Sequence, residues 1–163
     1  METIQPVRGF LPFPVIVKEV GQGMGRESLK ALLQLPLAAV DFAAAGGTNF
    51  AKLELLRNDP AKLEIYSQLA NVGHSAEEMV NLTNELAAEL GDKLLCRQLI
   101  ISGGVGNFLD GYYLTCKSDL PAIYGQASAF LKHARGTYDE LAAFIQTQVE
   151  GLELARAFLT IKK

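Results

Sequence analysis

The chain has 163 residues, of which 49% are hydrophobic and 20% are charged, and this composition predicts one globular domain over residues 1–163. A net charge of −3 without any Lys/Arg-rich run argues against a nucleic-acid partner. No apolar run is long enough to span a bilayer, and the first residues resemble neither a signal peptide nor a transit peptide, so we expect a cytoplasmic protein with no membrane contact.

The first third of the chain predicts a strand, a helix and a second strand. Pro6 disfavours a helix, so residues 3–6 are expected to be extended. A run of β-branched residues predicts a strand over 14–19 that is covered on both faces, as in a parallel sheet. Residues 26–35 place three leucines on one helical face, and a second strand is expected over 38–43.

The rest of the chain continues the alternation. Helices are expected over residues 50–57, 61–69, 76–90, 107–116 and 138–160, and strands over 97–102 and 121–125. The clearest helix start is at Ser75, because Glu78 three residues later completes a capping box. Gly91 is expected to end that helix.

Strands that alternate with helices predict an α/β fold with a parallel sheet and right-handed crossovers. Two closures fit the pattern: an open doubly wound sheet, or half or part of a TIM-type (β/α)8 barrel made of parallel (β/α) units. Both place ligands at the carboxyl ends of the strands. The glycine-rich and polar segments gather at these ends, at residues 18–19, 43–48, 102–107 and 126–128, which predicts one shared ligand site.

Several residues at this rim have a functional and a structural interpretation. Lys18 follows three apolar residues and could be a fixed cation beside an anion or an electron-poor ring, or a lysine that reaches solvent. Backbone amides near residues 102–104 and 127–128 could hold a phosphate, or form simple turns. Asp41 lies in an apolar strand and needs a partner or a polar lumen. His74 and His133 have no pattern that brings them together, so no metal site is expected.

Four motifs together resemble those of a known family. They are PVIVKEVGQGM at residues 14–24, VDFAAAGGTNF at 40–50, ISGGV at 101–105 and FLK at 130–132. They are similar to motifs of type 2 isopentenyl-diphosphate delta-isomerase, an FMN-dependent (β/α)8 barrel that interconverts isopentenyl and dimethylallyl diphosphate. The resemblance runs from about Gln5 to the C-terminus and covers only the C-terminal half of the family's barrel, so it implies a single (β/α)4-like domain.

The resemblance also implies roles for matching positions. Lys18 would lie beside the flavin ring and Thr48 would contact the cofactor, whereas Gln5 would contact the isoprenoid diphosphate. The remaining positions would hold the FMN phosphate: Gly104, Val105, Gly106, Ala127 and Ser128. The family also uses NADPH and Mg²⁺, but its magnesium-binding Glu is replaced here by Val7, and its Ser at position 43 by Ala43.

These departures predict a partial chain that is inactive by itself. A half-barrel would need a second copy of itself or a partner chain that carries the missing half. Two other functions fit less of the pattern. One is a non-catalytic flavin- or phosphate-binding half-barrel. The other is half of an FMN-dependent oxidase or dehydrogenase barrel, which would need a histidine base near the last strands, where only His133 lies.

Overall fold

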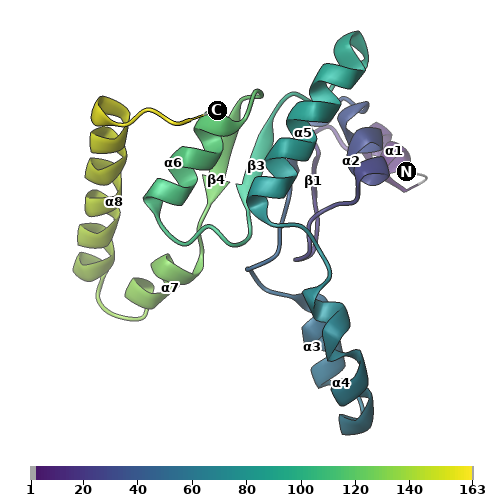
Figure 1. Ribbon diagram of the computed structural model, residues 1–163, viewed down its shortest axis with the longest axis horizontal. Coiled ribbons are helices and arrows are strands. Elements are labelled where there is room, and N and C mark those ends of the chain that lie inside the picture. Colours follow the sequence, from purple (N-terminus) through teal and green to yellow (C-terminus); the bar gives the residue numbers. More distant parts are fainter. Residues whose placement is uncertain (1–2, 163) are drawn as a thin grey trace.

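Four parallel strands form the centre of the computed structural model, which describes residues 3–162 (Figure 1). The strands are β1 (Ile16–Lys18), β2 (Ala39–Asp41), β3 (Leu99–Ser102) and β4 (Ala122–Gly125), in the spatial order β1-β2-β3-β4. Each lies within its predicted range, and the α/β fold class is confirmed. The sequential strand order fits part of a (β/α) barrel, because a doubly wound sheet reverses its order at a switch point.

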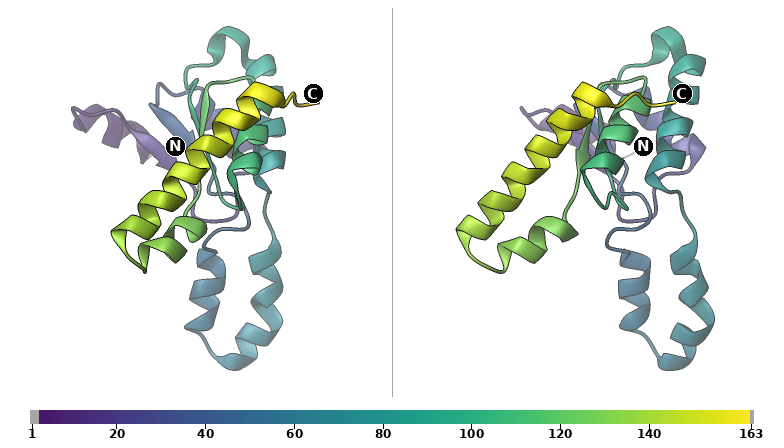
Figure 2. Two further views of the ribbon diagram at one scale, coloured as in Figure 1. Left: turned by 90° about the vertical axis from the view of Figure 1, so that its left-hand side faces the viewer. Right: turned by 60° about the vertical axis from the view of Figure 1, so that its left-hand side comes forward.

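Helices follow every strand. They are α2 (Arg26–Leu33), α3 (Phe50–Leu56), α4 (Pro60–Tyr66), α5 (Ala76–Leu90), α6 (Phe108–Lys117), α7 (Ser128–Ala134) and α8 (Tyr138–Phe158), with short 3-10 turns at Ser67–Asn71 and Gly91–Lys93. Figure 2 shows α5 and α6 together on one side of the sheet. No helix of the described chain is both long enough and apolar enough to cross a membrane.

The hydrophobic core lies between this helical layer and one face of the sheet. Val40 and Ile101 of the sheet pack with the predicted leucine face of α2 and with Met79 and Leu86 of α5, all buried. The opposite face contains the row Lys18, Asp41, Ile100 and Ile123, which the strand register aligns across all four strands. In a closed barrel this second face would be the interior.

The prediction that β1 is covered on both faces is wrong. Ile16 is 52% exposed, and Ile123 at the other edge of the described sheet is 64% exposed. Both belong to the face opposite the helices. The apolar run that predicted burial therefore describes a surface that the described chain leaves open to solvent.

The expected extended segment at residues 3–6 is also wrong, because α1 (Ile4–Phe10) begins there. Pro6 is the third residue of this helix. The N–H groups of a first turn have no acceptor inside the helix, so a proline there removes no hydrogen bond. Another difference follows β4, where the sequence predicted only a rim segment at residues 126–128 and no helix, whereas α7 spans Ser128–Ala134.

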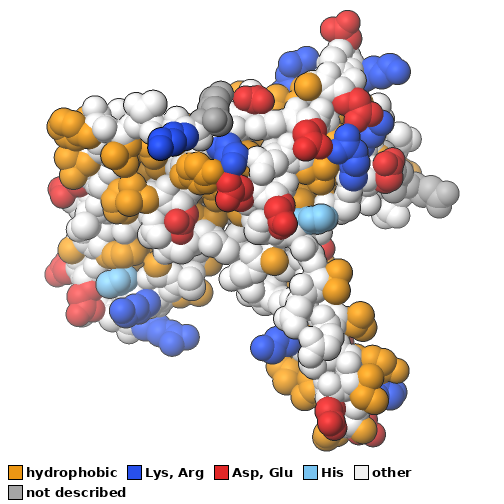
Figure 3. Space-filling model, in the orientation of Figure 1, with side chains coloured by type: hydrophobic (Ala, Val, Ile, Leu, Met, Phe, Trp, Pro, Cys, Tyr) orange, Lys and Arg blue, Asp and Glu red, His pale blue; other side chains and the backbone are white. Residues whose placement is uncertain are grey.

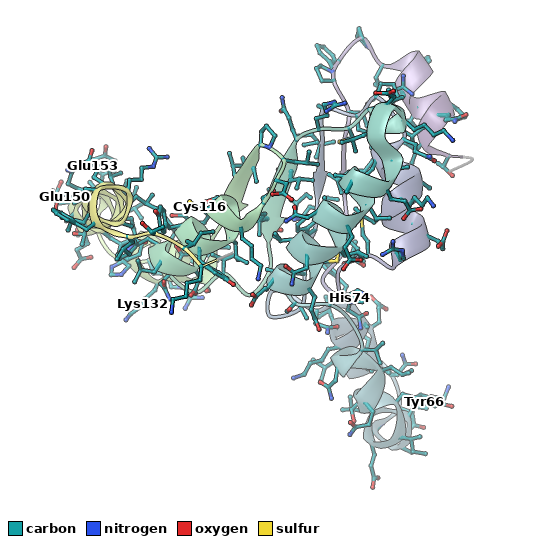
Figure 4. All side chains as sticks on the ribbon, turned by 45° about the horizontal axis from the view of Figure 1, so that its top comes forward. Tyr66, His74, Cys116, Lys132, Glu150 and Glu153 are labelled. Carbon is teal, nitrogen blue, oxygen red and sulfur yellow. The ribbon has the colours of Figure 1, made fainter. Side chains whose placement is uncertain are left out.

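The helices α3 and α4 form an arm that extends from the carboxyl ends of the strands (Figures 1 and 4). Figure 4 shows Tyr66 far along this arm and His74 at its base. The side chain of Asn49 donates to the carbonyl of Ala70 at 2.5 Å, and the amide of Ala45 donates to the carbonyl of His74 at 2.8 Å. These bonds close the base of the arm. Figure 3 shows hydrophobic side chains over much of its surface.

The capping box at the start of α5 is present as predicted. The amide of Glu78 donates to Ser75 Oγ at 3.2 Å, while the backbone N–H of Ser75 donates to the Glu78 carboxylate at 2.7 Å. These donors, the backbone N–H first and then the hydroxyl, lower the pKa of Glu78 below its ordinary value. A lowered carboxylate pKa contributes stability above the unfolded-state pKa, and that contribution is lost as the pH falls through the lowered value.

Ser75→Ala is expected to lower the free energy of unfolding by about 1 kcal/mol near neutral pH, because the backbone amide of Glu78 loses its acceptor. The difference from wild type should narrow in acid, as Glu78 becomes protonated. Urea denaturation at several pH values measures both effects. Ser28→Ala replaces an exposed serine within α2 and should change stability by less than about 0.5 kcal/mol. Equal losses from the two substitutions would contradict a role for the cap.

Candidate functional site

The carboxyl ends of the four strands surround a cavity of about 1050 Å³. Its floor is the open face of the sheet, represented by Asp41, Ile100 and Ser102. Its walls are the loops that follow the strands, and Phe50 at the start of the arm also lines it. This volume is just above the range of about 300–1,000 Å³ found for ligand pockets.

The prediction of one shared rim can be tested at the glycines. Gly46 follows β2 and Gly104 follows β3, and a Cβ atom built on Gly46 would lie 2.7 Å from the Gly104 Cα. Gly103 has a φ of +88°, and a Cβ there would overlap the backbone of Ala44. The two glycine-rich loops therefore touch through their backbones, at the same end of the sheet. Only glycine permits this approach, because any side chain would separate the loops.

Seven of the eight predicted site residues line this cavity. They are Lys18, Thr48, Gly104, Val105, Gly106, Ala127 and Ser128. They come from the end of β1 and from the segments after the other three strands, so the fold brings together positions that are up to 110 residues apart (18 to 128). The eighth, Gln5, is exposed in α1 and is not among the residues that line the cavity.

Lys18 is held on the cavity floor by two neighbours. Its ammonium lies 2.6 Å from Asp41 Oδ2 and 3.2 Å from Ser102 Oγ. The hydroxyl of Ser102 donates to the other carboxylate oxygen of Asp41. Asp41 thus finds the partner that the sequence required, but the sequence did not reveal that the partner is Lys18 or that Ser102 joins them.

Two more polar side chains shape the walls. The carboxylate of Glu19 accepts hydrogen bonds from the amides of Gly21 at 2.6 Å and Gln22 at 2.8 Å, which orders the loop after β1. Gln126 donates from Nε2 to the carbonyl of Gly106 at 2.6 Å, and this bond joins the loops after β3 and β4. The sequence placed both residues at the rim and gave no signal of these contacts.

The amide of Gly106 is already engaged. It donates to Asp110 Oδ2 at 3.0 Å, and the side-chain amide of Asn107 donates to the same oxygen at 2.9 Å. An anion in the cavity would therefore depend on other amides of this loop, or would displace the Asp110 carboxylate. The signal for this contact was present in the sequence, since an Asn cap followed by an acidic residue three positions later is typical of a helix start.

The two histidines lie away from the cavity lining. The ring of His133 stacks on Phe144 of α8, with centroids 4.1 Å apart and planes 16° from parallel. His74 lies in the loop before α5, and its amide donates to the carbonyl of Gln22 at 2.8 Å. Within residues 3–162, no three His, Cys, Asp or Glu side chains are close enough together to hold a metal ion.

The fold and the site define a parallel (β/α) unit with a cavity at the carboxyl ends of its strands. Curated proteins named isopentenyl-diphosphate delta-isomerase resemble this chain. One from Listeria innocua is 37% identical over 123 residues, which is 74% of this chain and 32% of the relative. One from Bacillus licheniformis is 33% identical over 153 residues, which is 92% of this chain and 40% of the relative.

A third relative with the same name, from Rickettsia africae, is 28% identical over 152 residues, which is 93% of this chain and 42% of the relative. The chain therefore spans less than half the length of these curated relatives. No family model matches the chain.

Proposed function

We propose that this chain is the FMN-binding, C-terminal portion of a type 2 isopentenyl-diphosphate isomerase barrel. The observation that carries the proposal is that the seven cofactor positions implied by the resemblance, which come from distant parts of the sequence, all line one cavity. The names of the curated relatives support the isomerase part of the proposal. We also propose that the protein is cytoplasmic.

The lining of the cavity is compatible with FMN. Ile100, Val20 and Phe50 offer apolar surface for a flat ring, and Lys18 offers a hydrogen-bond donor at the floor. The backbone at Gly104, Val105, Ala127 and Ser128, which lines the cavity, would receive the phosphate, and Gly106 would take part only if Asp110 releases its amide. When bound, FMN in its reduced form would supply acid–base chemistry at the ring. The described residues would bind and orient it.

The substrate and metal sites would depend on residues outside this cavity. Gln5, the proposed contact to the isoprenoid diphosphate, lies in α1. Val7, in the same helix, has no oxygen to offer to Mg²⁺, a cation that prefers oxygen ligands. We therefore propose that the chain alone is inactive, and that NADPH, Mg²⁺ and substrate act in an assembly that includes a second half-barrel, either another copy or a partner chain.

One rival function meets a specific difficulty. An FMN-dependent oxidase or dehydrogenase would need a histidine base facing the ring. In the described chain His133 is stacked on Phe144 between α7 and α8, and neither histidine lines the cavity. This geometry favours the isomerase proposal over the oxidase. A non-catalytic flavin or phosphate binder shares the same cavity and differs only in turnover.

Titration of FMN into the purified protein, followed by flavin fluorescence, tests the cofactor. We expect saturable binding by the wild type, and an affinity about tenfold weaker for Lys18→Met, because the ring loses a charged donor. Lys93→Met changes an exposed lysine of the turn Gly91–Lys93, which does not line the cavity, and should bind as the wild type does. Unchanged fluorescence for all three proteins would contradict the proposal.

A further inference from the structure

Lys18, Asp41 and Ser102 form a closed triangle of hydrogen bonds at the ends of three neighbouring strands. Lys18 ends β1, Asp41 ends β2 and Ser102 ends β3. The strand register aligns Lys18 with Asp41, and Ser102 lies two residues beyond Ile100, the partner of Asp41 in β3. All three side chains therefore lie on the face of the sheet that forms the cavity floor.

Both carboxylate oxygens of Asp41 accept hydrogen bonds. Its Oδ2 atom accepts from Lys18, and its Oδ1 atom accepts from Ser102 and from the amide of Ala43 at 3.1 Å. The side chain of Asp41 is only 11% exposed, whereas that of Lys18 is 57% exposed. The carboxylate is thus held in place at the cavity floor, and the ammonium is the more exposed of the two charged groups.

The triangle leaves the ammonium one donor for a ligand. A lysine ammonium has three N–H groups, and two are directed at Asp41 and Ser102. The third can reach an acceptor atom in the cavity that Lys18 lines. Because the carboxylate lies 2.6 Å from the ammonium, a ligand meets an oriented donor whose positive charge is largely balanced.

We infer that Asp41 is a positioning residue that sets the charge which Lys18 presents to the ring of the cofactor. The inference rests on the proposed flavin site. A neutral, oxidised flavin needs only the hydrogen bond that Lys18 donates. A reduced flavin is anionic when it has lost its N1 proton, and any excess positive charge at the cavity floor strengthens its binding. Asp41 therefore limits how much more tightly the site binds the reduced, anionic flavin than the oxidised flavin.

The experiment compares the dissociation constants of oxidised and reduced FMN, obtained from titration and from the midpoint potential of the bound flavin. Asp41→Asn removes one negative charge and keeps the shape. We expect the ratio of the oxidised to the reduced constant to rise by about tenfold, which is about 1.4 kcal/mol, because the anionic flavin then meets an ammonium whose charge is no longer balanced. Ser102→Ala keeps all charges and should change the ratio by less than about threefold.

An unchanged ratio in Asp41→Asn, in a protein whose circular dichroism matches the wild type, would overturn the inference. So would an equal rise in Ser102→Ala, because loss of geometry would then explain the effect. Both results would leave flavin binding by the wild type intact, and so leave the proposed function standing.

A second measurement does not depend on flavin. Hydrogen exchange of lysine ammonium groups, followed by ¹⁵N NMR at low temperature, should be slower at Lys18 than at the exposed Lys93, and Asp41→Asn should remove the difference. If the wild type binds no flavin but Lys18 is protected, the proposed cofactor is wrong and the positioning role is supported. If Lys18 exchanges as fast as Lys93, the positioning role is wrong whatever the cofactor.

Discussion

Light scattering on the purified chain is expected to give the mass of two chains. The open face of the sheet exposes Ile16 and Ile123, and β1 and β4 are the edges of the described sheet. A second copy related by a two-fold axis along the strands would pair each β1 with a β4 and complete eight parallel strands. Each 100 Å² of apolar surface buried in this way contributes about 2.5 kcal/mol.

Charged substitutions on the open face test this arrangement. Ile16→Lys and Ile123→Lys should each shift the protein to the mass of one chain, because a buried lysine without a partner opposes association. Ile65→Lys, on the arm, replaces an isoleucine that is 71% exposed and does not belong to the sheet, and it should leave the mass unchanged. A well-folded wild-type monomer at micromolar concentration would contradict the self-association and favour a partner chain.

Isomerase activity of the chain alone is expected to be absent. With isopentenyl diphosphate, reduced FMN and Mg²⁺ supplied, we expect turnover more than about 100-fold below that of a full-length relative such as the Bacillus licheniformis protein. Two causes act together. The cavity is open on the side that a second half-barrel would cover, so water reaches its floor. Val7 also offers no oxygen ligand to the metal.

The assay is the conversion of labelled substrate to dimethylallyl diphosphate, with the relative as the positive control. Addition of a separately produced N-terminal half of a relative tests whether the missing wall limits the rate. Substantial turnover by the pure chain would show that the proposal of inactivity is wrong. Flavin binding without turnover, even after this addition, would favour the non-catalytic binder.

The elements of the fold could be predicted because their signals are local. The capping box at Ser75, the leucine face of α2 and the β-branched run at residues 15–17 each depend on a few adjacent residues. The exposure of Ile16 could not be predicted, since burial of a strand depends on what packs against it. The helix at Pro6 was missed because a proline acts differently in a first turn than in a helix interior.

The location of the cavity could also be predicted, because the carboxyl ends of parallel strands always meet at one edge. Its internal contacts could not. The pairing of Lys18 with Asp41 depends on the register of β1 against β2, and a slip of one residue would place one of these side chains on the opposite face. The bond from Gly106 to Asp110 is local, and the sequence around it contains a recognisable helix-start pattern.

The arm formed by α3 and α4 leaves the domain and returns to it at nearly the same point, since Ala45 is bonded to His74 and Asn49 to Ala70. A segment with adjoining ends can change in length without moving the strands that flank it. Residues 50–70 are therefore a natural place to graft a reporter or to shorten the protein. A short glycine-rich replacement would keep the sheet and its core, and would remove Phe50 from the cavity lining and the bonds that Asn49 and Gln22 donate to Ala70 and Leu69.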